Sequence, residues 1–274
     1  MENMPKAESL MFDRTERLVG ADAMKRIAAT RVILFGVGGV GGWCAESLVR
    51  SSIRHLTLVD CDTVNVSNLN RQVQATTRTL GQLKVEALKE RLLTINPDAE
   101  IDTVTEAYNA ETADHFHLED YDFVIDAIDS LSPKAHLILH ATGLPVTLLS
   151  SMGSALKLDP TKIRVSEFWK VQYCPLARSL RKKFKHWKQF PERKFQCVYS
   201  PEVLDNQIET PDDTTPDEFH KVQTNGTVAH ITAIFGFTLA GLLLEAVACE
   251  APSGVPSPPI VGAGMETPYM NNIP

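Results

Sequence analysis

The sequence predicts an α/β fold: a doubly wound, Rossmann-like, mostly parallel sheet extended by antiparallel strands. Three observations predict it. Short apolar runs of strand length alternate with amphipathic helical stretches through the first half of the chain. The glycine-rich stretch FGVGGVGG, residues 35–42, joins the first strand to the first helix. Asp60 ends the second strand-like run, LTLVD, where this fold carries an acidic residue that binds a ribose.

The elements of the first half follow one another in the order that a doubly wound sheet requires. Each expected strand is a short apolar run, and each expected helix keeps apolar residues three and four positions apart. Asn96-Pro97 stops the second helix, because the residue before a proline disfavours helical backbone. Strands are expected at Val32–Phe35, Leu56–Val59, Ile101–Val104, Phe123–Ile125 and Pro145–Leu149, and helices at 40–48, 85–95 and 132–142.

The second half is organised differently. Ile163–Trp169 is expected to be an antiparallel strand. Eight cations, opposed only by Glu192, occupy residues 178–194, and an acidic, turn-rich stretch over 201–225 is expected to be a long mobile loop. We therefore expect one domain over residues 12–250, with the basic segment and loop of 178–225 inserted into it, and a flexible tail over 251–274.

Composition excludes several classes of protein. With 43% hydrophobic and 22% charged residues, the chain is typical of a globular protein. A net charge of -7 argues against wholesale coating of nucleic acid, but it allows a local basic patch. Five scattered cysteines without a CxxC pair indicate neither a disulfide framework nor a zinc site, and they fit a reducing cytosol. The first residues contain no signal-peptide core, so we expect a cytoplasmic protein.

The segment 228–249 is almost wholly apolar and is near the length of a membrane span. It contains His230 and Glu245 and has no basic flank, which disfavours spanning. We expect a buried core helix or an interface helix, and membrane association through this segment stays open.

The glycine stretch is suited to holding phosphate. Gly36 permits the tight turn, Gly38 lets the backbone approach phosphate oxygens, and Gly41 lets helix and strand pack closely. Backbone N–H groups at the start of the following helix then face the anion. The motif alone is compatible with either NAD or ATP.

Polar residues after the second and fourth strands favour ATP. Asn68, Arg71 and Lys84 follow Asp60, and cations near the phosphates are expected where a triphosphate is split and charge builds on its oxygens. Asp126 and Asp129, in DAIDS at the end of a strand, suit Mg²⁺, which prefers one or two carboxylates plus phosphates. Arg17, in RTERLVG before the first strand, is expected to meet a phosphate across a subunit boundary.

Five segments, RTERLVG, FGVGGVGGWCAESL, LTLVDCDTVNVSNLNRQ, GQLKVEALKERLLTINP and FVIDAIDS, together resemble the adenylation domain of the superfamily of ubiquitin-activating, ThiF and MoeB proteins. The resemblance implies that the chain binds ATP and Mg²⁺ and forms a homodimer. It implies ATP phosphates on Gly36, Gly38, Gly39 and Gly41, ribose on Asp60, the triphosphate on Asn68, Arg71 and Lys84, Mg²⁺ on Asp129, and Arg17 reaching in from a partner subunit, with Arg17, Arg71, Lys84 and Asp129 serving catalysis.

Two later segments, VYSPE at 198–202 and ITAIFGF at 231–237, resemble one branch, the tRNA threonylcarbamoyladenosine dehydratases. That branch implies an ATP-dependent, cyclising dehydration of threonylcarbamoyladenosine in the tRNA anticodon loop, through a carboxyl-adenylate. The alternatives are an adenylyltransferase that activates the C-terminus of a ubiquitin-like or sulfur-carrier protein, an NAD-dependent dehydrogenase, and a non-catalytic tRNA- or membrane-binding module. A sulfur-transfer protein is a further candidate partner.

The resemblance gives the basic segment an expected role in binding tRNA, with aromatic side chains stacking on loop bases. The competing interpretation is a solvated helix face. Cys197 invites comparison with the catalytic cysteine of some relatives, but a lone cysteine beside a valine more often packs in a core. The expected tRNA-binding residues are Arg181, Lys182, Lys183, Lys185 and Lys188, interleaved with Phe184, Trp187 and Phe190.

Overall fold

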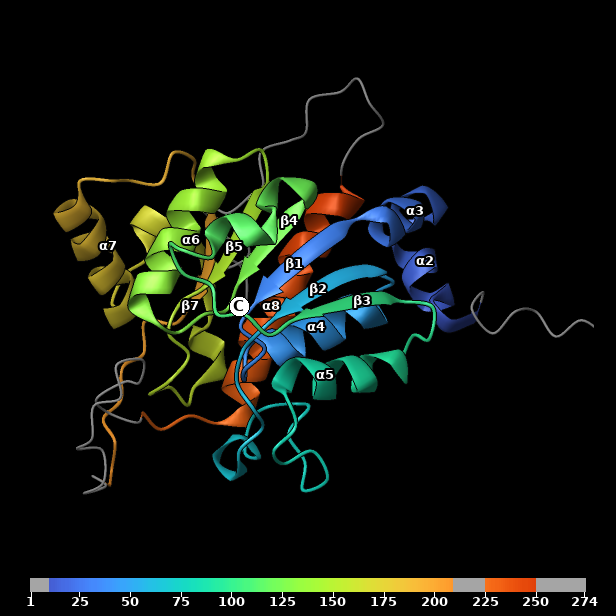
Figure 1. Ribbon diagram of the computed structural model, residues 1–274, viewed down its shortest axis with the longest axis horizontal. Coiled ribbons are helices and arrows are strands. Elements are labelled where there is room, and N and C mark those ends of the chain that lie inside the picture. The colour runs from blue at the N-terminus through green and yellow to red at the C-terminus, as the bar shows by residue number, and fades with distance from the viewer. Residues whose placement is uncertain (1–9, 209–224, 250–274) are drawn as a thin grey trace, which may run out of the picture.

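The computed structural model describes residues 10–208 and 225–249 (Figure 1). Within these residues one sheet has the strand order β3-β2-β1-β4-β5-β7-β6, and helices cover both of its faces. All neighbouring strands are parallel except β6 and β7, which are antiparallel. The predicted fold class is confirmed. The strands are β1 Arg31–Phe35, β2 His55–Val59, β3 Glu100–Val104, β4 Phe123–Asp126, β5 Thr147–Ser151, β6 Arg164–Glu167 and β7 Gln196–Tyr199.

An apolar cluster lies on each face of the sheet, between the strands and the helices that cover that face. Alternate residues of β1 point to opposite faces, so Leu34 belongs to one cluster and Phe35 to the other. The first cluster packs under α3, α4, α5 and α8, and the second under α6 and α7. The helices are α2 Asp13–Val19, α3 Ala21–Ala29, α4 Gly41–Arg50, α5 Lys84–Leu93, α6 Leu131–Gly143, α7 Pro175–Trp187 and α8 Ala229–Ala248.

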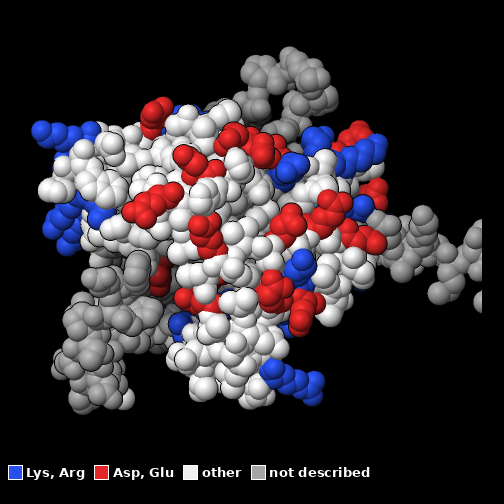
Figure 2. Space-filling model, viewed as in Figure 1, with Lys and Arg blue, Asp and Glu red and all other residues white. Residues whose placement is uncertain are grey.

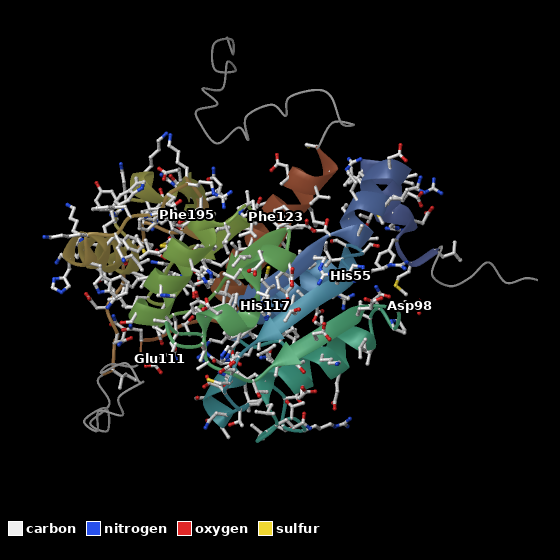
Figure 3. The ribbon with its side chains drawn as sticks, turned by 45° about the horizontal axis from the view of Figure 1, so that its top comes forward. His55, Asp98, Glu111, His117, Phe123 and Phe195 are labelled. Atoms are coloured by element: carbon white, nitrogen blue, oxygen red, sulfur yellow. The ribbon has the colours of Figure 1, made fainter. Side chains whose placement is uncertain are left out.

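The carboxyl ends of the parallel strands form one edge of the sheet, where the glycine stretch begins. The opposite edge is the one where the strands start. In Figure 3 His55 and Asp98 mark that opposite edge, at the start of β2 and just before β3. In Figure 1 α2 and α3 also lie there, beyond the start of β1.

The apolar segment forms α8, which packs on the sheet. Its mean hydropathy of 2.0 and its length would suffice to cross a membrane, but half of that window is buried inside the molecule. Gly236 lies where α8 crosses α4, and a Cβ there would stand 2.4 Å from the carbonyl oxygen of Val40. The ITAIFGF segment is therefore a close helix crossing beside the glycine stretch, as expected of a core helix.

Several details go beyond or differ from the sequence-based expectations. β5 begins at Thr147, two residues later than expected, and α6 begins at Leu131 with Ser130 at its N-cap position. β7 was not predicted, because its four residues carry no alternating pattern and β5 pairs with it from far along the chain. The basic segment largely forms the regular helix α7. The expected mobile loop and tail fall largely on residues 209–224 and 250–274, which lie outside the described residues.

The VYSPE segment ends in a carboxylate that holds a neighbouring loop. The carboxylate of Glu202 accepts the N–H groups of Leu158 at 2.7 Å and Asp159 at 2.9 Å, and the ammonium of Lys162 lies 3.0 Å away. The backbone N–H of Glu202 donates to the hydroxyl of buried Ser200. The N–H groups of Asp159 and Leu158, and then the Lys162 ammonium, favour the ionised carboxylate, so they lower the pKa of Glu202 to about 2.

Glu202→Gln is expected to lower the melting temperature at neutral pH and to flatten the acid side of the stability curve. Because the folded-state pKa lies below the ordinary value of 4.5, the contribution of Glu202 is present above pH 4.5 and is lost as pH falls toward 2. Melting temperatures measured from pH 2 to 7 for both proteins test this. Two curves that stay parallel down to pH 2 contradict it.

Candidate nucleotide site

The glycine stretch turns sharply between β1 and α4. Gly36 has a φ of +85°, and a Cβ on it would lie 2.8 Å from the carbonyl oxygen of Ala127. A Cβ on Gly41 would lie 1.9 Å from the carbonyl oxygen of Gly36. Gly38 is open by contrast, since its nearest neighbour would be Gln72 Nε2 at 3.8 Å. Two glycines thus close the turn, and Gly38 leaves its backbone accessible to a ligand.

Asp60 joins the end of β2 to this turn. Its carboxylate accepts the N–H of Val37 at 2.8 Å and the N–H of Asp62 at 2.9 Å. Burial raises the pKa of Asp60, and the nearby Lys84 charge and the two N–H groups partly offset that rise. The expected ribose-binding carboxylate therefore stands directly beside the glycine turn.

The segment after β2 docks on the glycine stretch through contacts that the sequence did not reveal. Gln74 Nε2 donates to the carbonyl oxygen of Val37 at 2.6 Å, and Trp43 Nε1 of α4 donates to that of Arg71 at 3.0 Å. A Cβ on Gly39 would lie 3.3 Å from Cγ of Arg71. The Arg71 side chain is thereby carried to the mouth of the turn.

Two cations of this segment, Arg71 and Lys84, are engaged with protein groups. The Arg71 guanidinium donates to the Ser67 carbonyl at 2.8 Å and to Asn70 Oδ1 at 2.9 Å. Burial lowers the pKa of Arg71, and the Asp129 charge offsets part of this, which brings Arg71 and Asp129 into one electrostatic neighbourhood. Lys84, buried at the first position of α5, holds Asp62 Oδ2 at 2.5 Å.

Asn68 is buried, and its side chain shapes the same segment. Oδ1 of Asn68 accepts the N–H of Asn65 at 3.0 Å, while the Asn65 side chain accepts the N–H of Ser67 at 3.1 Å. This reciprocal capping box fixes the short helical turn Val66–Asn68. The amide oxygen of Asn68 thus has a structural role, which the sequence did not indicate.

The two aspartates of DAIDS lie in very different environments. Asp126 is fully buried and pairs with Lys134 at 2.7 Å, so its carboxylate does not face a ligand. Asp129 is exposed three residues further on. Of the two aspartates that suit Mg²⁺ by their place in the sequence, only Asp129, the one to which the resemblance assigns the ion, is exposed. Lys134 was missed, although a lysine within the apolar pattern of a helix is a signal that could have found it.

Arg17 is not brought to the glycine stretch of its own chain. It lies in α2, pairs with Asp13 at 2.8 Å and is 76% exposed. Thr232, near the start of α8, lies beside Gly39, whereas Arg26 of α3 donates to the carbonyl oxygens of Val247 and Ala248 at the other end of that helix. A helix of this length spans about 30 Å. Arg17 therefore stands at the far edge of the sheet.

The basic segment divides into structural and exposed cations. The Arg181 guanidinium donates to the carbonyl oxygens of Phe168 and Val171, and Lys183 donates to Ser132 Oγ. Phe184 is fully buried, so it is not available for stacking. Figure 2 shows basic side chains gathered at the left, over α7. The exposed members of this face are Arg178, Lys182, Lys185 and Lys188, together with the partly exposed aromatics Trp169, Tyr173, Trp187 and Phe190.

Cys197 lies in β7 with no exposed surface, and burial raises the pKa of its thiol well above the ordinary value. It is therefore a packing residue and not a reactive thiol. His136 and His140, four residues apart on α6, both place Nδ1 3.1 Å from the hydroxyl of Tyr108, so the two rings share this hydroxyl as a hydrogen-bond partner.

The ThiF family pattern matches residues 12–261, so the chain belongs to the ThiF family. This confirms the resemblance drawn from the motifs. A tRNA threonylcarbamoyladenosine dehydratase of Haemophilus influenzae is 34% identical over 239 residues, covering 85% of this chain and 92% of that protein. A molybdopterin-synthase adenylyltransferase of the same organism is 31% identical, covering 68% of this chain and 74% of that protein.

Solved structures of a tRNA threonylcarbamoyladenosine dehydratase are also similar to this chain. The crystal structure of the Escherichia coli tRNA N6-threonylcarbamoyladenosine dehydratase in complex with ATP has a TM-score of 0.77 and 31% sequence identity, covering 90% of this chain and 97% of that one. A second structure of that protein, equally similar, is in complex with AMP.

Proposed function

We propose that this chain is an ATP-dependent tRNA threonylcarbamoyladenosine dehydratase. The observation that carries the proposal is the meeting of a phosphate-accessible glycine turn with Arg71, Asp60 and Asp129 at one edge of the sheet. A dehydrogenase has no comparable need for a cation and a carboxylate around a diphosphate. The relatives that cover most of the chain carry this activity in their names.

The proposed reaction uses ATP to remove water. A carboxylate oxygen of the threonyl group attacks the α-phosphorus, the bond to the β-phosphate breaks, and pyrophosphate leaves. The carbamoyl part then attacks the resulting acyl-adenylate and closes a ring, and AMP departs with the carboxylate oxygen. The chain's residues position these groups and neutralise charge, so no protein nucleophile is required.

Each residue has a proposed task in this reaction. The backbone of Gly38 and its neighbours holds the phosphates, and Asp60 binds the ribose. Arg71 and Lys84 neutralise the charge that develops on the phosphoryl oxygens. Asn68 helps these two cations to hold the triphosphate. Asp129 supplies the carboxylate that would hold Mg²⁺ together with the phosphates, and the ion would polarise the phosphoryl group when bound.

Nucleoside analysis tests the proposal directly. Transfer RNA bearing threonylcarbamoyladenosine is incubated with the chain and ATP, digested and separated by mass spectrometry. The expected result is a nucleoside lighter by one water, together with AMP and pyrophosphate, and none of these without ATP. An unchanged nucleoside contradicts the proposal. Pyrophosphate release only upon addition of a carrier protein ending in Gly-Gly would favour the adenylyltransferase alternative instead.

We further propose that the exposed face of α7 binds tRNA phosphates. Replacing Lys182, Lys185 and Lys188 by alanine is expected to weaken tRNA binding and to make its salt dependence shallower by about two to three units of slope. The KM for ATP should stay unchanged, because this face is separate from the glycine turn.

Arg181→Ala provides the contrast in the same helix. Its guanidinium holds two backbone carbonyls, so the variant is expected to lose melting temperature and to keep its salt slope. Intact tRNA affinity in the triple variant, measured by filter binding, contradicts the proposed role of α7.

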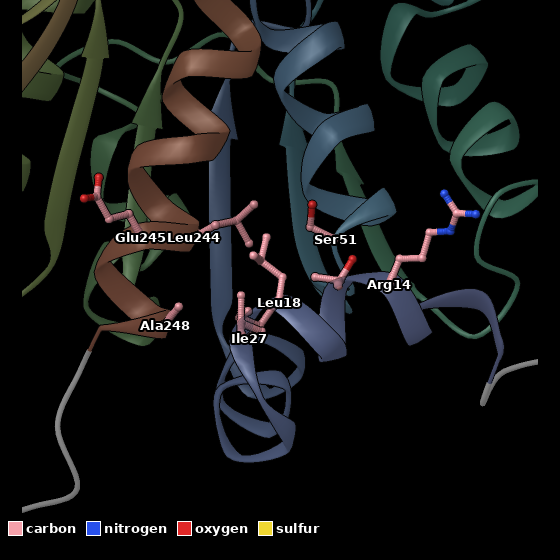
Figure 4. Close-up of a pocket in the computed structure, with 9 residues that line it drawn as sticks. Arg14, Leu18, Ile27, Ser51, Leu244, Glu245 and Ala248 are labelled. Atoms are coloured by element: carbon pink, nitrogen blue, oxygen red, sulfur yellow. The ribbon is translucent and has the colours of Figure 1, made fainter.

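A homodimer would bring Arg17 to a glycine turn. The outer face of α8 is apolar between exposed His230 and Glu245, with Phe237 45% exposed. Leu18 of α2 is 85% exposed beside the C-terminal end of α8. Leu18, Leu244 and Ala248 line an apolar pocket of about 360 Å³ between α2 and α8 (Figure 4). Because α8 runs from the glycine turn to α2, two copies that pack their α8 helices antiparallel place α2 of each beside the turn of the other.

Complementation tests this arrangement. Arg17→Ala and Arg71→Ala are each expected to be inactive alone, but a mixture of equal amounts that exchanges subunits should recover about a quarter of wild-type activity. Half of the dimers are then mixed, and one of the two sites in each mixed dimer carries both arginines. No recovery in a mixture proven to contain mixed dimers contradicts the proposal.

A cytoplasmic location follows from a tRNA substrate and is part of the proposal. The apolar outer face of α8 is assigned here to a second copy rather than to a membrane. Docking of a sulfur-transfer protein stays a prediction, as do the domain bounds of 12–250 with 178–225 inserted.

A further inference from the structure

A fully buried ion pair lies behind the strand end that leads to Asp129. Lys134 of α6 and Asp126 of β4 have no exposed side-chain surface, and Lys134 Nζ lies 2.7 Å from Asp126 Oδ2. The same ammonium donates to the carbonyl oxygen of Ile128 at 2.9 Å. One charge therefore ties together both sides of the turn that follows β4.

The side chains of Lys134, Ser150 and Asp126 together form a clamp, to which the carboxylate of Asp126 contributes two further contacts. Its Oδ1 accepts the N–H of Ile128 at 3.1 Å, and Ser150 Oγ donates to Oδ2 at 2.7 Å. Ser150 stands opposite Asp126 in the parallel register of β4 and β5, so the sheet itself fixes the hydroxyl. Since Asp126, Lys134 and Ser150 are all buried, the clamp cannot touch a ligand.

The clamped turn borders the proposed nucleotide site on two sides. The N–H of Ala127 donates to the carbonyl oxygen of Phe35 at 2.8 Å, and its own carbonyl fills the space where a Cβ on Gly36 would stand. At the other end of the turn Asp129 acts electrostatically on Arg71. A shift of this turn would therefore move both the glycine stretch and the Asp129 carboxylate.

We infer that Lys134 is a positioning residue for the adenylation step, acting through Asp126 and Ile128 to hold Asp129 against the glycine turn. The inference rests on the proposed function and adds to it a residue that contacts neither ATP nor tRNA. A buried ion pair contributes little net stability compared with a neutral pair of similar shape. A gain in the stability of the fold therefore does not explain why two charges lie in this core. A misplacement of 1 Å in a reacting site can lower a rate about a hundredfold.

The double variant Asp126→Asn/Lys134→Met tests this, because it removes both charges and nearly keeps both shapes. Its kcat is expected to fall about a hundredfold, while the KM for ATP changes less than about threefold and the melting temperature stays near that of the wild type. Hydrogen exchange at the amides of Ala127 and Ile128 should become faster. The matched control is Asp22→Asn/Lys25→Met, a surface pair with both side chains more than three-quarters exposed, which should change none of these.

Two single variants guard against a double variant that does not fold. Ser150→Ala removes one donor to Asp126 and keeps the ion pair, and it is expected to lower kcat about fivefold. Lys134→Arg keeps a charge that can donate to both oxygens, so its kcat should fall much less than the hundredfold expected when both charges are removed.

Wild-type kcat and wild-type exchange in a folded double variant overturn the inference, as does a fall in kcat that only follows the folded fraction. The exchange measurement needs no turnover. It therefore decides the inference even if the wild-type chain leaves tRNA unchanged, which would contradict only the proposed function.

Discussion

Replacing Arg71 by alanine is expected to lower kcat for dehydration of tRNA-borne threonylcarbamoyladenosine by about 10²–10³-fold. Cγ of Arg71 lies beside Gly39 of the glycine turn, so the guanidinium is carried close to where charge would build on the phosphoryl oxygens as pyrophosphate leaves. Truncation removes that charge, and Thr232, the other side chain next to Gly39, is uncharged and cannot replace it.

The fold should survive this change. The side chain of Arg71 gives up only two bonds, to the Ser67 carbonyl and to Asn70, while its backbone carbonyl still accepts Trp43 Nε1. Arg78→Ala, an exposed arginine of the same segment, is the control and should keep full activity. Single-turnover kinetics with melting curves measure both effects. An Arg71→Ala variant within threefold of wild type contradicts the proposed role.

Gly41→Ala is expected to destabilise the fold, whereas Gly38→Ala is expected to keep the fold and to weaken ATP binding. At Gly41 the new methyl would meet the carbonyl oxygen of Gly36 at 1.9 Å, and rigid backbone cannot yield as a side chain does. We expect a loss of about 3 kcal/mol in the free energy of unfolding, which is a fall of roughly 6–12 °C in melting temperature. At Gly38 the methyl meets only Gln72 at ordinary contact distance, so the fold is kept.

The Gly38→Ala methyl instead occupies the approach of the phosphates, so the Kd for ATP is expected to rise about tenfold or more. Calorimetric melting and ATP titration of both variants separate the two effects. If Gly38→Ala binds ATP as the wild type does, the phosphates do not lie on this part of the turn. If Gly41→Ala melts like the wild type, the turn is not held as described.

The local parts of the fold could be predicted from the sequence, and the non-local parts could not. β1, α4 and β2 were predicted because apolar periodicity and the glycines act within a few residues. β7 was not, because Gln196–Tyr199 becomes a strand through pairing with β5, which lies more than forty residues earlier. Propensity contains no information about such a partner.

Some residues of the candidate site could likewise be predicted from the sequence, and others could not. Gly36, Gly41, Asp60 and Arg71 belong to motifs whose spacing predicts their place, and the structure brings them together. Charge composition alone does not reveal whether a cation is solvated or bound to carbonyl groups. Arg181 was therefore grouped with exposed lysines, and the clamp of Lys134 on Asp126 went unseen, although both residues were plain in the sequence.

The position of α8 has a consequence for how the chain folds. This helix comes last among the described elements, yet it packs on α4, and Gly236 touches the backbone at Val40, where α4 begins. Contacts between such distant parts of a chain slow folding, because a long loop must close before they form. During synthesis β1 and α4 therefore keep one apolar face uncovered until about 200 further residues have left the ribosome. The nucleotide turn is completed late, and a chain that stops before α8 is expected to aggregate rather than to bind ATP.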